Sequence, residues 1–527
     1  MAGRASFSER LVAGGLVLAG LLVFSLSVVL VPPAVTVGQA AAPWTDGAEY
    51  LDAAVSFVRD GVFRIHVAGE PHPSRYPFGY SLLVAGALAL GVDPAAAPHR
   101  VNQAAGLALL LLTAGYLWRR GRPADAGLAV LLLATMPSLL ILSRSPLSEV
   151  SGTLVAVSGV WLLYGYAGDG SLRKAASGAA LLALSVCFRP SNLLLLAAFV
   201  PAAAAARLGR RSKPAAGVLA LGAAAAAGLV PVLVYNFVTF GSPITTGYDY
   251  WAPYWNVSRA FQLRFIVPNL EYAGRELLER ETLFTTANLY GRGSYVGPSF
   301  VLLTLLAPFG LRPSRRFWCF AVAGLAYFGL MTTYFFSDAR LLFPLFVLAA
   351  PVAATGLAST WRRRRGRAGR FVAAVAAVLF LSAVAGWPSA GGGAESVVFL
   401  RPPRSADDSP AYRVTRQLLR LRAEAPRLVL TDLPPPYVHA LSPLGTLVAP
   451  LYDDHLFRFA PRVLVFGGPE RRRLVADALA AGRAVWAVTS DHDVLGLAQA
   501  SPPPAGYAWE IVGRDRRSGG IARLVER

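Results

Sequence analysis

The sequence has 527 residues, of which 55% are hydrophobic and 15% are charged. Soluble proteins usually carry about 25% charged residues, whereas apolar runs of about 20 residues, each able to cross a bilayer core of about 30 Å, recur along this chain. These values exclude a soluble protein and predict one that crosses a membrane many times. In a membrane protein, basic residues collect in the loops on the cytoplasmic side. We therefore explain the net charge of +20 by the positions of these residues along the chain, and we expect no nucleic-acid partner.

The apolar runs predict about eleven membrane spans. The first run is longer than the core of a signal peptide, which is about 7–15 residues, so we interpret it as an uncleaved span. The predicted spans are residues 11–32, 101–118, 126–143, 148–166, 175–188, 191–206, 215–238, 295–311, 317–335, 341–358 and 370–387.

A further apolar run at 78–91 is short, and the basic residues decide how it lies. Cytoplasmic loops collect Lys and Arg, and the basic clusters fall on one side only if this run does not cross. We therefore expect 78–91 to lie in the outer interface or to re-enter it, with the N-terminus inside and the C-terminus outside. The basic clusters are residues 119–122, 173–174, 207–213, 312–316 and 362–370.

The expected fold is an all-α polytopic membrane protein with about eleven transmembrane helices and interfacial helices in the first outer loop, followed by a small C-terminal α/β extracytoplasmic domain. The expected transmembrane unit is residues 1–388, with outer loops at 33–100 and 239–294, and the expected extracytoplasmic domain is 389–527. That tail alternates β-like and helical runs. The β-like runs are 428–430, 463–466 and 484–488, and the helical ones are 411–423 and 471–481.

The first outer loop concentrates acidic residues in a chain that otherwise avoids charge. Asp46 directly precedes an amphipathic helical pattern over 48–58. A carboxylate held at the membrane surface is well placed to act as a general base toward a hydroxyl or amine acceptor. Asp is also a favoured N-cap residue, so Asp46 could cap that helix instead of, or in addition to, taking a proton.

Three more charged residues lie at the ends of spans on the same predicted face. Glu149 follows Arg144 in a short outer turn, where it could be functional, occupy the first turn of a helix or pair with Arg144. Arg189 and Arg340 are exceptions to the positive-inside rule, and a guanidinium there can bind phosphate oxygens. The alternative is a snorkelling or ion-paired arginine, with Asp338 as a partner for Arg340.

Aromatic residues accompany these charges. In the first outer loop, His72 and Arg75 could contact an anionic lipid head group, while Tyr76 and Tyr80 could anchor the chain at the interface. Tyr248, in the second outer loop, could stack on a sugar ring or belong to the interfacial aromatic belt.

Taken in order, these residues resemble the GT-C superfamily of integral-membrane glycosyltransferases, and most closely the bacterial relatives of protein O-mannosyltransferases and aminoarabinose transferases. The resemblance covers about residues 10–360 and depends on the order of its motifs rather than on any one of them. The motifs are Asp46, Tyr76-Pro77-Phe78-Gly79-Tyr80, Glu149, Arg189-Pro190, the segment 235–248 and Arg340.

The resemblance implies a hexosyl- or pentosyltransferase of the bacterial cytoplasmic membrane that uses a polyprenyl-phosphate-linked sugar and inverts in one step. The acceptor could be a glycan, a lipid or a protein. No cofactor is expected, and a metal is not supported because Gly47 and Ala48 follow Asp46. The residues assigned to catalysis are Asp46, Glu49 and Glu149; those assigned to the donor phosphate are Arg340, Arg189, Arg75 and His72; those assigned to the substrate groove are Tyr50, Tyr76, Tyr80 and Tyr248.

Two other classes stay open. A transporter or lipid flippase would carry charge at mid-depth in its spans and show repeat symmetry. A noncatalytic partner in envelope assembly would keep the fold but tolerate the loss of Asp46. Two Asp/His clusters in the tail, at 453–455 and 491–493, could hold a metal and are left unassigned.

Overall fold

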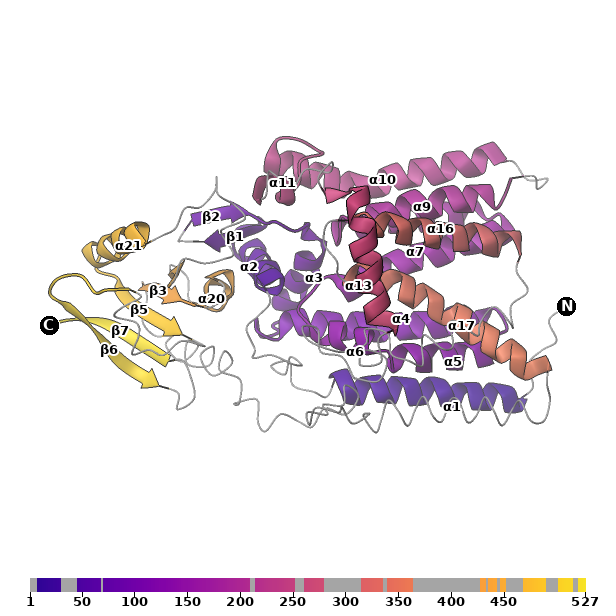
Figure 1. Cartoon of the computed structure of the whole chain (residues 1–527), viewed down its shortest axis with the longest axis horizontal. Coiled ribbons are helices and arrows are strands. Elements are labelled where there is room, and N and C mark those ends of the chain that lie inside the picture. Colours follow the sequence, from indigo (N-terminus) through magenta and orange to yellow (C-terminus); the bar gives the residue numbers. More distant parts are fainter. Residues whose placement is uncertain are drawn as a thin grey trace.

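The computed structural model of the chain has a bundle of helices at one end and a β-sheet at the other (Figure 1). The N-terminus lies at the far end of the bundle, and the C-terminus lies at the sheet end. The structure describes residues 7–29, 45–67, 70–208, 214–251, 260–278, 314–334, 339–363, 427–432, 435–442, 446–451, 468–489, 501–514 and 520–527.

Within these residues, five helices are long and apolar enough to cross a membrane, or six if one bent pair forms a single span. The expected number of eleven is not confirmed, and the predicted spans at 295–311 and 370–387 lie outside the described residues. The bundle comprises α1 (Phe7–Phe24) with η1 (Ser25–Val29), α4 (Ala97–Arg119), α5 (Pro123–Ala134), α6 (Pro137–Arg144), α7 (Glu149–Asp169), α8 (Leu172–Leu184) with η2 (Ser185–Cys187), α9 (Asn192–Ala205), α10 (Pro214–Phe240), α16 (Arg315–Thr332), η4 (Ala339–Leu342) and α17 (Phe343–Arg363).

The bent pair is α5 and α6, whose axes differ by 67°. The sequence predicted one span at 126–143, and the structure divides this run into two helices. Pro137 has no backbone N–H and disfavours helical geometry in the residue before it, so α5 ends at Ala134 and a new helix begins at the proline.

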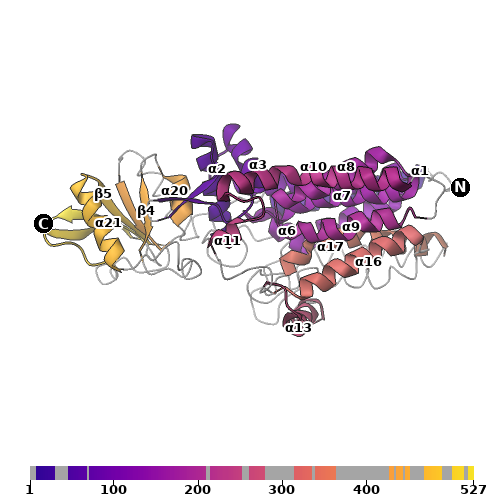
Figure 2. The same cartoon turned by 90° about the horizontal axis from the view of Figure 1, so that it is seen from above.

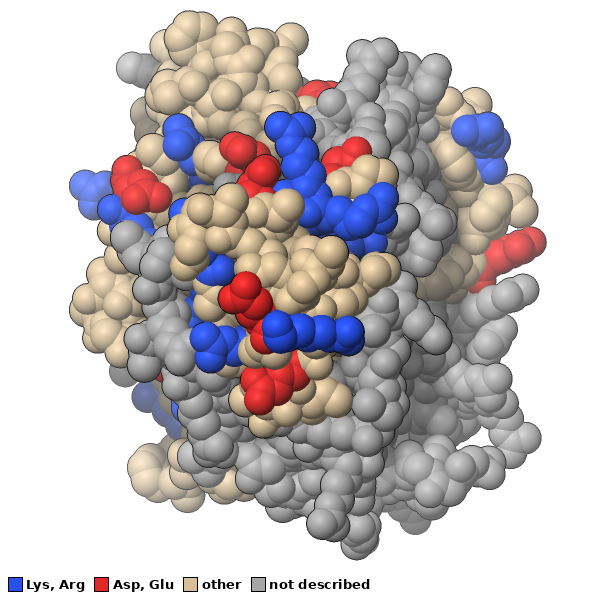
Figure 3. Space-filling view, turned by 90° about the vertical axis from the view of Figure 1, so that its left-hand side faces the viewer, with Lys and Arg blue, Asp and Glu red and all other residues tan. Residues whose placement is uncertain are grey.

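Apolar side chains cover the outside of the bundle. Leu18 on α1, Leu219 on α10 and Leu325 on α16 are each about 70% exposed. A large apolar surface of this kind is costly in water and is expected of helices that face lipid. The sheet end differs, because Figure 3 shows acidic and basic side chains interspersed on its described surface. Arg473 and Asp477 form one exposed ion pair of this region.

The basic turns of the bundle meet at the end where the N-terminus lies. Arg120, after α4, and Arg316, on α16, both stack on the ring of Tyr164, at 5.4 Å and 4.2 Å from its centroid. Arg315 donates to the backbone carbonyl of Ala205 at the end of α9. Three of the turns whose arginines were expected on the inner side are therefore neighbours.

The opposite end carries the first outer loop. Its elements are α2 (Thr45–Asp60), the antiparallel hairpin of β1 (Arg64–Val67) and β2 (Glu70–Pro73), and α3 (Phe78–Ala89). Helix α3 has 12 residues, which is about 18 Å and shorter than the bilayer core of about 30 Å. The hairpin was not predicted, although the alternate burial of Ile65 and Val67 is the pattern of a strand.

The described residues of the second outer loop form α11 (Gly247–Trp251), the turn η3 (Leu263–Phe265) and α13 (Ile266–Leu278). Of these elements, α11 contacts the hairpin. The indole of Trp251 donates to the carbonyl of Pro73 at 2.8 Å. A side chain at 247 would meet the carbonyl oxygen of Arg75 at 2.3 Å, so only glycine permits this contact between the two loops.

The C-terminal sheet region has five strands in the order β4-β3-β5-β7-β6. Strands β3, β4 and β5 are parallel, and β7 and β6 join antiparallel. The predicted strands at 428–430 and 484–488 and the helix at 471–481 are present within β3, β5 and α21. The runs at 411–423 and 463–466 lie outside the described residues. The elements are β3 (Arg427–Thr431), α20 (Pro435–Leu441), β4 (Leu447–Pro450), α21 (Gly468–Ala480), β5 (Ala484–Thr489), β6 (Tyr507–Arg514) and β7 (Gly520–Glu526).

Alternation along β3 gives this sheet two cores. Leu428 and Leu430 pack with Val475 of α21, whereas Val429 faces the other side and packs with Val438 of α20. Helix α20 lies between the sheet and α2 in both cartoon views (Figures 1 and 2). It is therefore the element through which the sheet region meets the first outer loop.

Candidate active site

Helix α2 presents three acids at helical spacing, Asp46, Glu49 and Asp52. Apolar residues of the same helix, among them Leu51 and Val55, are buried with residues of α3 and α20. Because residues three apart lie on neighbouring parts of a helix face, the acids project along one side of α2. Each of them meets a different set of partners.

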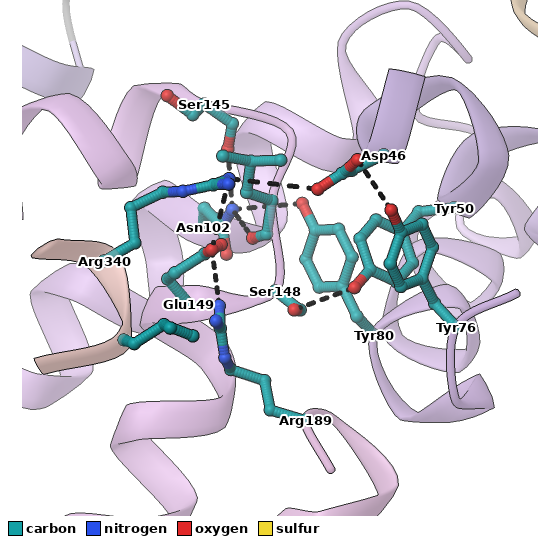
Figure 4. Close-up of polar contacts among 12 residues, drawn as sticks. Asp46, Tyr50, Tyr76, Tyr80, Asn102, Ser145, Ser148, Glu149, Arg189 and Arg340 are labelled. Carbon is teal, nitrogen blue, oxygen red and sulfur yellow. Dashed lines mark hydrogen bonds and ion pairs between the residues drawn. The ribbon is translucent and has the colours of Figure 1, made fainter. Parts of the chain in front are cut away.

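Asp46 lies in the first turn of α2, which begins at Thr45. The hydroxyl of Tyr76 donates to its Oδ1 at 2.6 Å, and its Oδ2 is 3.8 Å from a guanidinium nitrogen of Arg340 (Figure 4). The Asp46 side chain is 27% exposed. It is thus oriented by a neutral donor and lies close to a cation, yet it can still be reached from outside.

Glu149 begins α7 and is buried, with 5% of its side chain exposed. Its Oε1 forms an ion pair with Arg189 and lies 3.5 Å from the same Arg340 nitrogen that faces Asp46. The positive end of the α7 dipole adds to the stabilisation of this carboxylate. Arg340, on the turn η4, therefore lies between the carboxylates of α2 and α7.

Arg189 lies in the turn between η2 and α9, with 14% of its side chain exposed. Burial would lower the pKa of its guanidinium, but the neighbouring Glu149 carboxylate outweighs that effect and the pKa is raised. The cation is thus held charged by its acidic partner. The structure brings together Asp46, Glu149, Arg189 and Arg340 from four separate segments, as Figure 4 shows.

The second acid of α2 forms a different pair. Glu49 is 4% exposed, and its Oε1 lies 3.1 Å from a guanidinium nitrogen of Arg75. Burial raises the pKa of the Glu49 carboxyl from 4.5 to about 7, because the loss of water outweighs the attraction of Arg75. Glu49 and Arg75 lie beside Asp46 rather than in contact with Arg189.

The tyrosines assigned to the substrate groove occupy different positions. Tyr76 contacts Asp46, and the ring of Tyr248 packs edge-on against it with centroids 5.7 Å apart. Tyr50 is buried and donates to the hydroxyl of Ser148 at 2.9 Å. Tyr80 is fully buried and donates to a backbone carbonyl at Pro98. Of the four, Tyr248 is the most exposed, at 36%.

His72 lies apart from the arginines. On β2, its Nδ1 is 3.4 Å from the hydroxyl of Tyr250, and its ring packs edge-on against Trp251. Burial lowers the pKa of this imidazole, which favours its neutral form. A neutral histidine surrounded by aromatic rings is poorly suited to hold a phosphate, and its assignment to the donor stays a prediction.

One of the alternatives for Glu149, a pair with Arg144, is not the arrangement found, because Glu149 pairs with Arg189. The Arg144 guanidinium is buried, and its nitrogens have no hydrogen-bond partner in the described part of the chain. The suggested Arg340 partner, Asp338, lies outside the described residues.

Two structural contacts that the sequence did not reveal fix the site. Asn102, on α4, donates to the Tyr80 hydroxyl at 3.1 Å and to the carbonyl of Ser145 at 2.7 Å, which joins α3 to the turn before α7. A side chain at Gly47 would meet the ring of Pro146 in the same turn at 2.5 Å. The start of α2 is therefore pressed against the turn that precedes Glu149.

Among the described residues, one group of side chains could hold a metal ion. It comprises Asp52, His66 and His439, whose ligand atoms all lie within 4.8 Å of one another. The group was not predicted, since the three residues are distant in sequence and share no short motif. The clusters at 453–455 and 491–493 lie outside the described residues.

The described helices and the site indicate a multi-pass membrane protein with a cluster of acids and arginines at the α2 end of the bundle, and comparison with solved structures finds proteins of similar fold. ArnT from Cupriavidus metallidurans bound to undecaprenyl phosphate matches with a TM-score of 0.58 and 14% identity over 98% of both chains. The apo form matches with a TM-score of 0.58 and 13% identity over 97% of both chains.

A more distant match is the oligosaccharyltransferase AglB from Archaeoglobus fulgidus, with a TM-score of 0.50 and 13% identity over 98% of this chain and 75% of AglB. No protein-family model and no curated protein sequence matches the chain. At these identities the likeness shows the fold alone, and that fold agrees with the resemblance drawn from the sequence.

Proposed function

We propose that this protein is a glycosyltransferase that moves a sugar from a polyprenyl-phosphate donor to an acceptor at the outer face of the cytoplasmic membrane. The observation that carries the proposal is the position of Arg340 within 4 Å of both Asp46 and Glu149. The matched ArnT structure holds undecaprenyl phosphate, and the matched AglB structure holds a dolichol phosphate and an inhibitory peptide. These ligands support a lipid-phosphate donor here.

Asp46 is the proposed general base. Its carboxylate is partly exposed and is oriented by Tyr76, so it can accept a proton from an acceptor hydroxyl or amine as that group attacks the sugar. Attack opposite to the leaving phosphate inverts the anomeric carbon. Burial and the Asp46 charge raise the pKa of Tyr76 well above its usual value, so this phenol keeps its proton and stays a donor.

Arg340 and Arg189 are the proposed phosphate ligands. The bond between the sugar and the phosphate breaks with negative charge developing on the phosphate oxygen, and fixed cations at that point lower the barrier. Both guanidiniums are held by Glu149, which orients them before substrate arrives. Glu49 and Arg75 form a neutral pair beside the base and are proposed to shape its surroundings.

The proposed topology places the α2 end outside and the N-terminal end inside, with a catalytic unit at 1–388 and an extracytoplasmic unit at 389–527. It is supported by the positive-inside rule, since the arginines around Tyr164 gather at the end away from α2. A single cysteine in place of Leu83, an exposed residue of α3, in a chain without its two native cysteines, should resist a thiol reagent added from the cytoplasmic side. Labelling from that side would contradict the topology.

The test of function uses purified protein with a radiolabelled polyprenyl-phosphate sugar and measures the release of free polyprenyl phosphate when candidate acceptors are added. Asp46→Asn should lower the rate by about 10²- to 10⁴-fold, the usual contribution of a positioned base. Asp60→Asn, which removes an exposed acid from the other end of α2, is the matched control and should retain activity. Equal rates for Asp46→Asn and wild type would refute the role of Asp46.

Donor binding tests the arginines separately. Arg340→Ala should weaken the binding of undecaprenyl phosphate, measured by titration of the purified protein. Arg315→Ala removes an arginine from the opposite end of the bundle and should leave that affinity unchanged. An unaltered affinity in Arg340→Ala would exclude this residue as a phosphate ligand.

A further inference from the structure

The third acid of α2 joins parts of the chain that are far apart in sequence. Asp52 is fully buried; its Oδ1 lies 2.6 Å from Nδ1 of His439, and its Oδ2 lies 3.3 Å from Nδ1 of His66. The backbone N–H of His66 also donates to Oδ2 at 2.6 Å. Helix α2, strand β1 and helix α20 thus meet at a single carboxylate.

We propose that Asp52, His66 and His439 form a binding site for a divalent metal ion of the zinc class, which fastens the C-terminal sheet region to the first outer loop. Two imidazoles and one carboxylate form a donor set that suits zinc. In a tetrahedral zinc site with bonds of about 2.0–2.1 Å, the ligand atoms are about 3.3 Å apart. Ligand atoms that already lie within 4.8 Å of one another reach that arrangement through small side-chain rotations.

Electrostatics favours a cation at this point. A carboxylate with no exposure to water has lost its hydration and needs opposite charge nearby. Arg59, the basic residue in the last turn of α2, does not supply it, because its guanidinium donates to the carbonyl of Ser442. The Asp52 carboxylate instead faces two stacked imidazole rings, with centroids 3.8 Å apart.

The surroundings also fit a metal site that holds two units together. Ala440 and Leu441, next to His439, pack in the same apolar cluster as Leu51 and Val55 of α2, so the site has a dry wall on one side. The imidazole side chains keep 20% and 15% exposure, which leaves a route for the ion and room for a water as fourth ligand.

The site is separate from the proposed catalytic residues. Asp46 and Asp52 lie on the same helix, but Asp52 contacts neither Arg340 nor Glu149 among the interactions of the described residues. The proposed ion would therefore act on the joining of the two units rather than on the transfer reaction, and it can be tested without an acceptor.

The experiment uses the full-length protein with its affinity tag removed, stripped with a chelator, reloaded with Zn²⁺ and measured for bound metal. Wild type should retain about one zinc per chain. His66→Asn and His439→Asn should each weaken zinc binding at least tenfold, as expected when one of three ligands is lost. His72→Asn, which alters a histidine of the same hairpin outside the group, is the matched control and should bind zinc like wild type.

A second measurement does not depend on the folding of the variants. Co²⁺ bound to the wild-type protein should give the strong visible absorption of a four-coordinate site with nitrogen and oxygen ligands, and added Zn²⁺ should abolish it. Zinc should also raise the thermal unfolding temperature of wild type and of His72→Asn but not of the two ligand variants. Failure of wild type to bind zinc, equal binding in all four proteins, or six-coordinate cobalt would each overturn the proposal and leave a purely hydrogen-bonded group.

Discussion

Asp46 and Asp52 lie on the same helix, but the structure surrounds them differently. Asp46 keeps 27% of its side chain exposed, with one phenol as hydrogen-bond donor and an arginine at 3.8 Å. Asp52 has no exposure and faces two imidazoles and a backbone N–H. An acid that takes a proton from a substrate must be reachable, whereas an acid enclosed by fixed donors can only hold structure or a metal. Sequence position alone does not separate these roles.

Neutralising each acid in turn is the most direct test of whether Asp46 and Asp52 have different roles. Asp46→Asn should lower the transfer rate by about 10²- to 10⁴-fold and leave the thermal unfolding temperature near that of wild type. Asp52→Asn should do the reverse, lowering the unfolding temperature with a much smaller effect on rate, because the buried network loses the charge and one of its two central acceptor oxygens. The measurements are the transfer rates and the thermal unfolding curves of both variants. An equal loss of activity in the two would show that Asp46 and Asp52 do not differ in role.

The next largest effect is expected at Glu149, which is buried and lies beside the two arginines proposed to bind the phosphate. Glu149→Gln leaves the buried Arg189 without its carboxylate, which costs about 3–5 kcal/mol in comparable buried pairs. Thermal unfolding in detergent should show this as a large loss of stability. Glu149→Asp keeps the charge and should recover part of it. A Gln variant as stable as wild type would show that Arg189 is stabilised by other groups.

Glu49, the acid between Asp46 and Asp52 on α2, should make the stability of the protein depend on pH. Its pKa is raised from 4.5 to about 7 in the folded protein, so the folded state binds this proton more tightly than the unfolded state. Stability from this group is therefore complete below about pH 4.5 and is lost as the pH rises through 7, by up to about 3 kcal/mol. Glu49→Gln cannot lose a proton, so its unfolding temperature relative to wild type should rise from pH 5 to pH 8.

The matched control for Glu49 is Asp60→Asn, which neutralises an exposed acid on the same helix. Its unfolding temperature relative to wild type should vary less over that range, because an exposed carboxylate keeps its hydration. A difference between Glu49→Gln and wild type that stays constant, or that falls toward pH 8, would mean that Arg75 fully compensates for burial.

The smallest predicted effect concerns the phenol that orients the base. Tyr76→Phe removes one hydrogen bond to a charged acceptor, which is worth about 1.5–3 kcal/mol, and should reduce the transfer rate by about tenfold to a hundredfold. Tyr80→Phe is the comparison, because that hydroxyl donates to a backbone carbonyl away from Asp46. It should affect stability more than rate. A larger rate loss in Tyr80→Phe than in Tyr76→Phe would contradict the role of Tyr76 as the residue that orients the base.

Some of this arrangement could be predicted from the sequence. The amphipathic pattern after Asp46 indicated α2, and the positions of Glu149, Arg189 and Arg340 at span ends indicated a common face. These signals are local, or follow from a bilayer that orders span ends in two layers. The strand pattern at 428–430 was likewise local. Such features need no knowledge of how the helices pack.

Other features depend on packing and were missed. The contact between Asp52 and His439 requires α20 to dock on α2, and no sequence pattern around either residue predicts that docking. The break at Pro137 was hidden because the run on either side is apolar throughout. A pair of Arg144 with Glu149 was one alternative suggested by closeness in sequence, but Glu149 pairs with Arg189 instead. The hairpin β1–β2 was visible in the alternation of Ile65 and Val67 and was overlooked.

The contact between Gly47 and Pro146 sets a limit on how this chain can change over evolutionary time. Any side chain at 47 would force α2 away from the turn before α7, because the space between them is already filled. A displacement of about 1 Å at a reacting group can cost about a hundredfold in rate. Substitution at this position would thus be selected against through geometry alone, and a variant library covering α2 should recover glycine there even though glycine carries no chemistry.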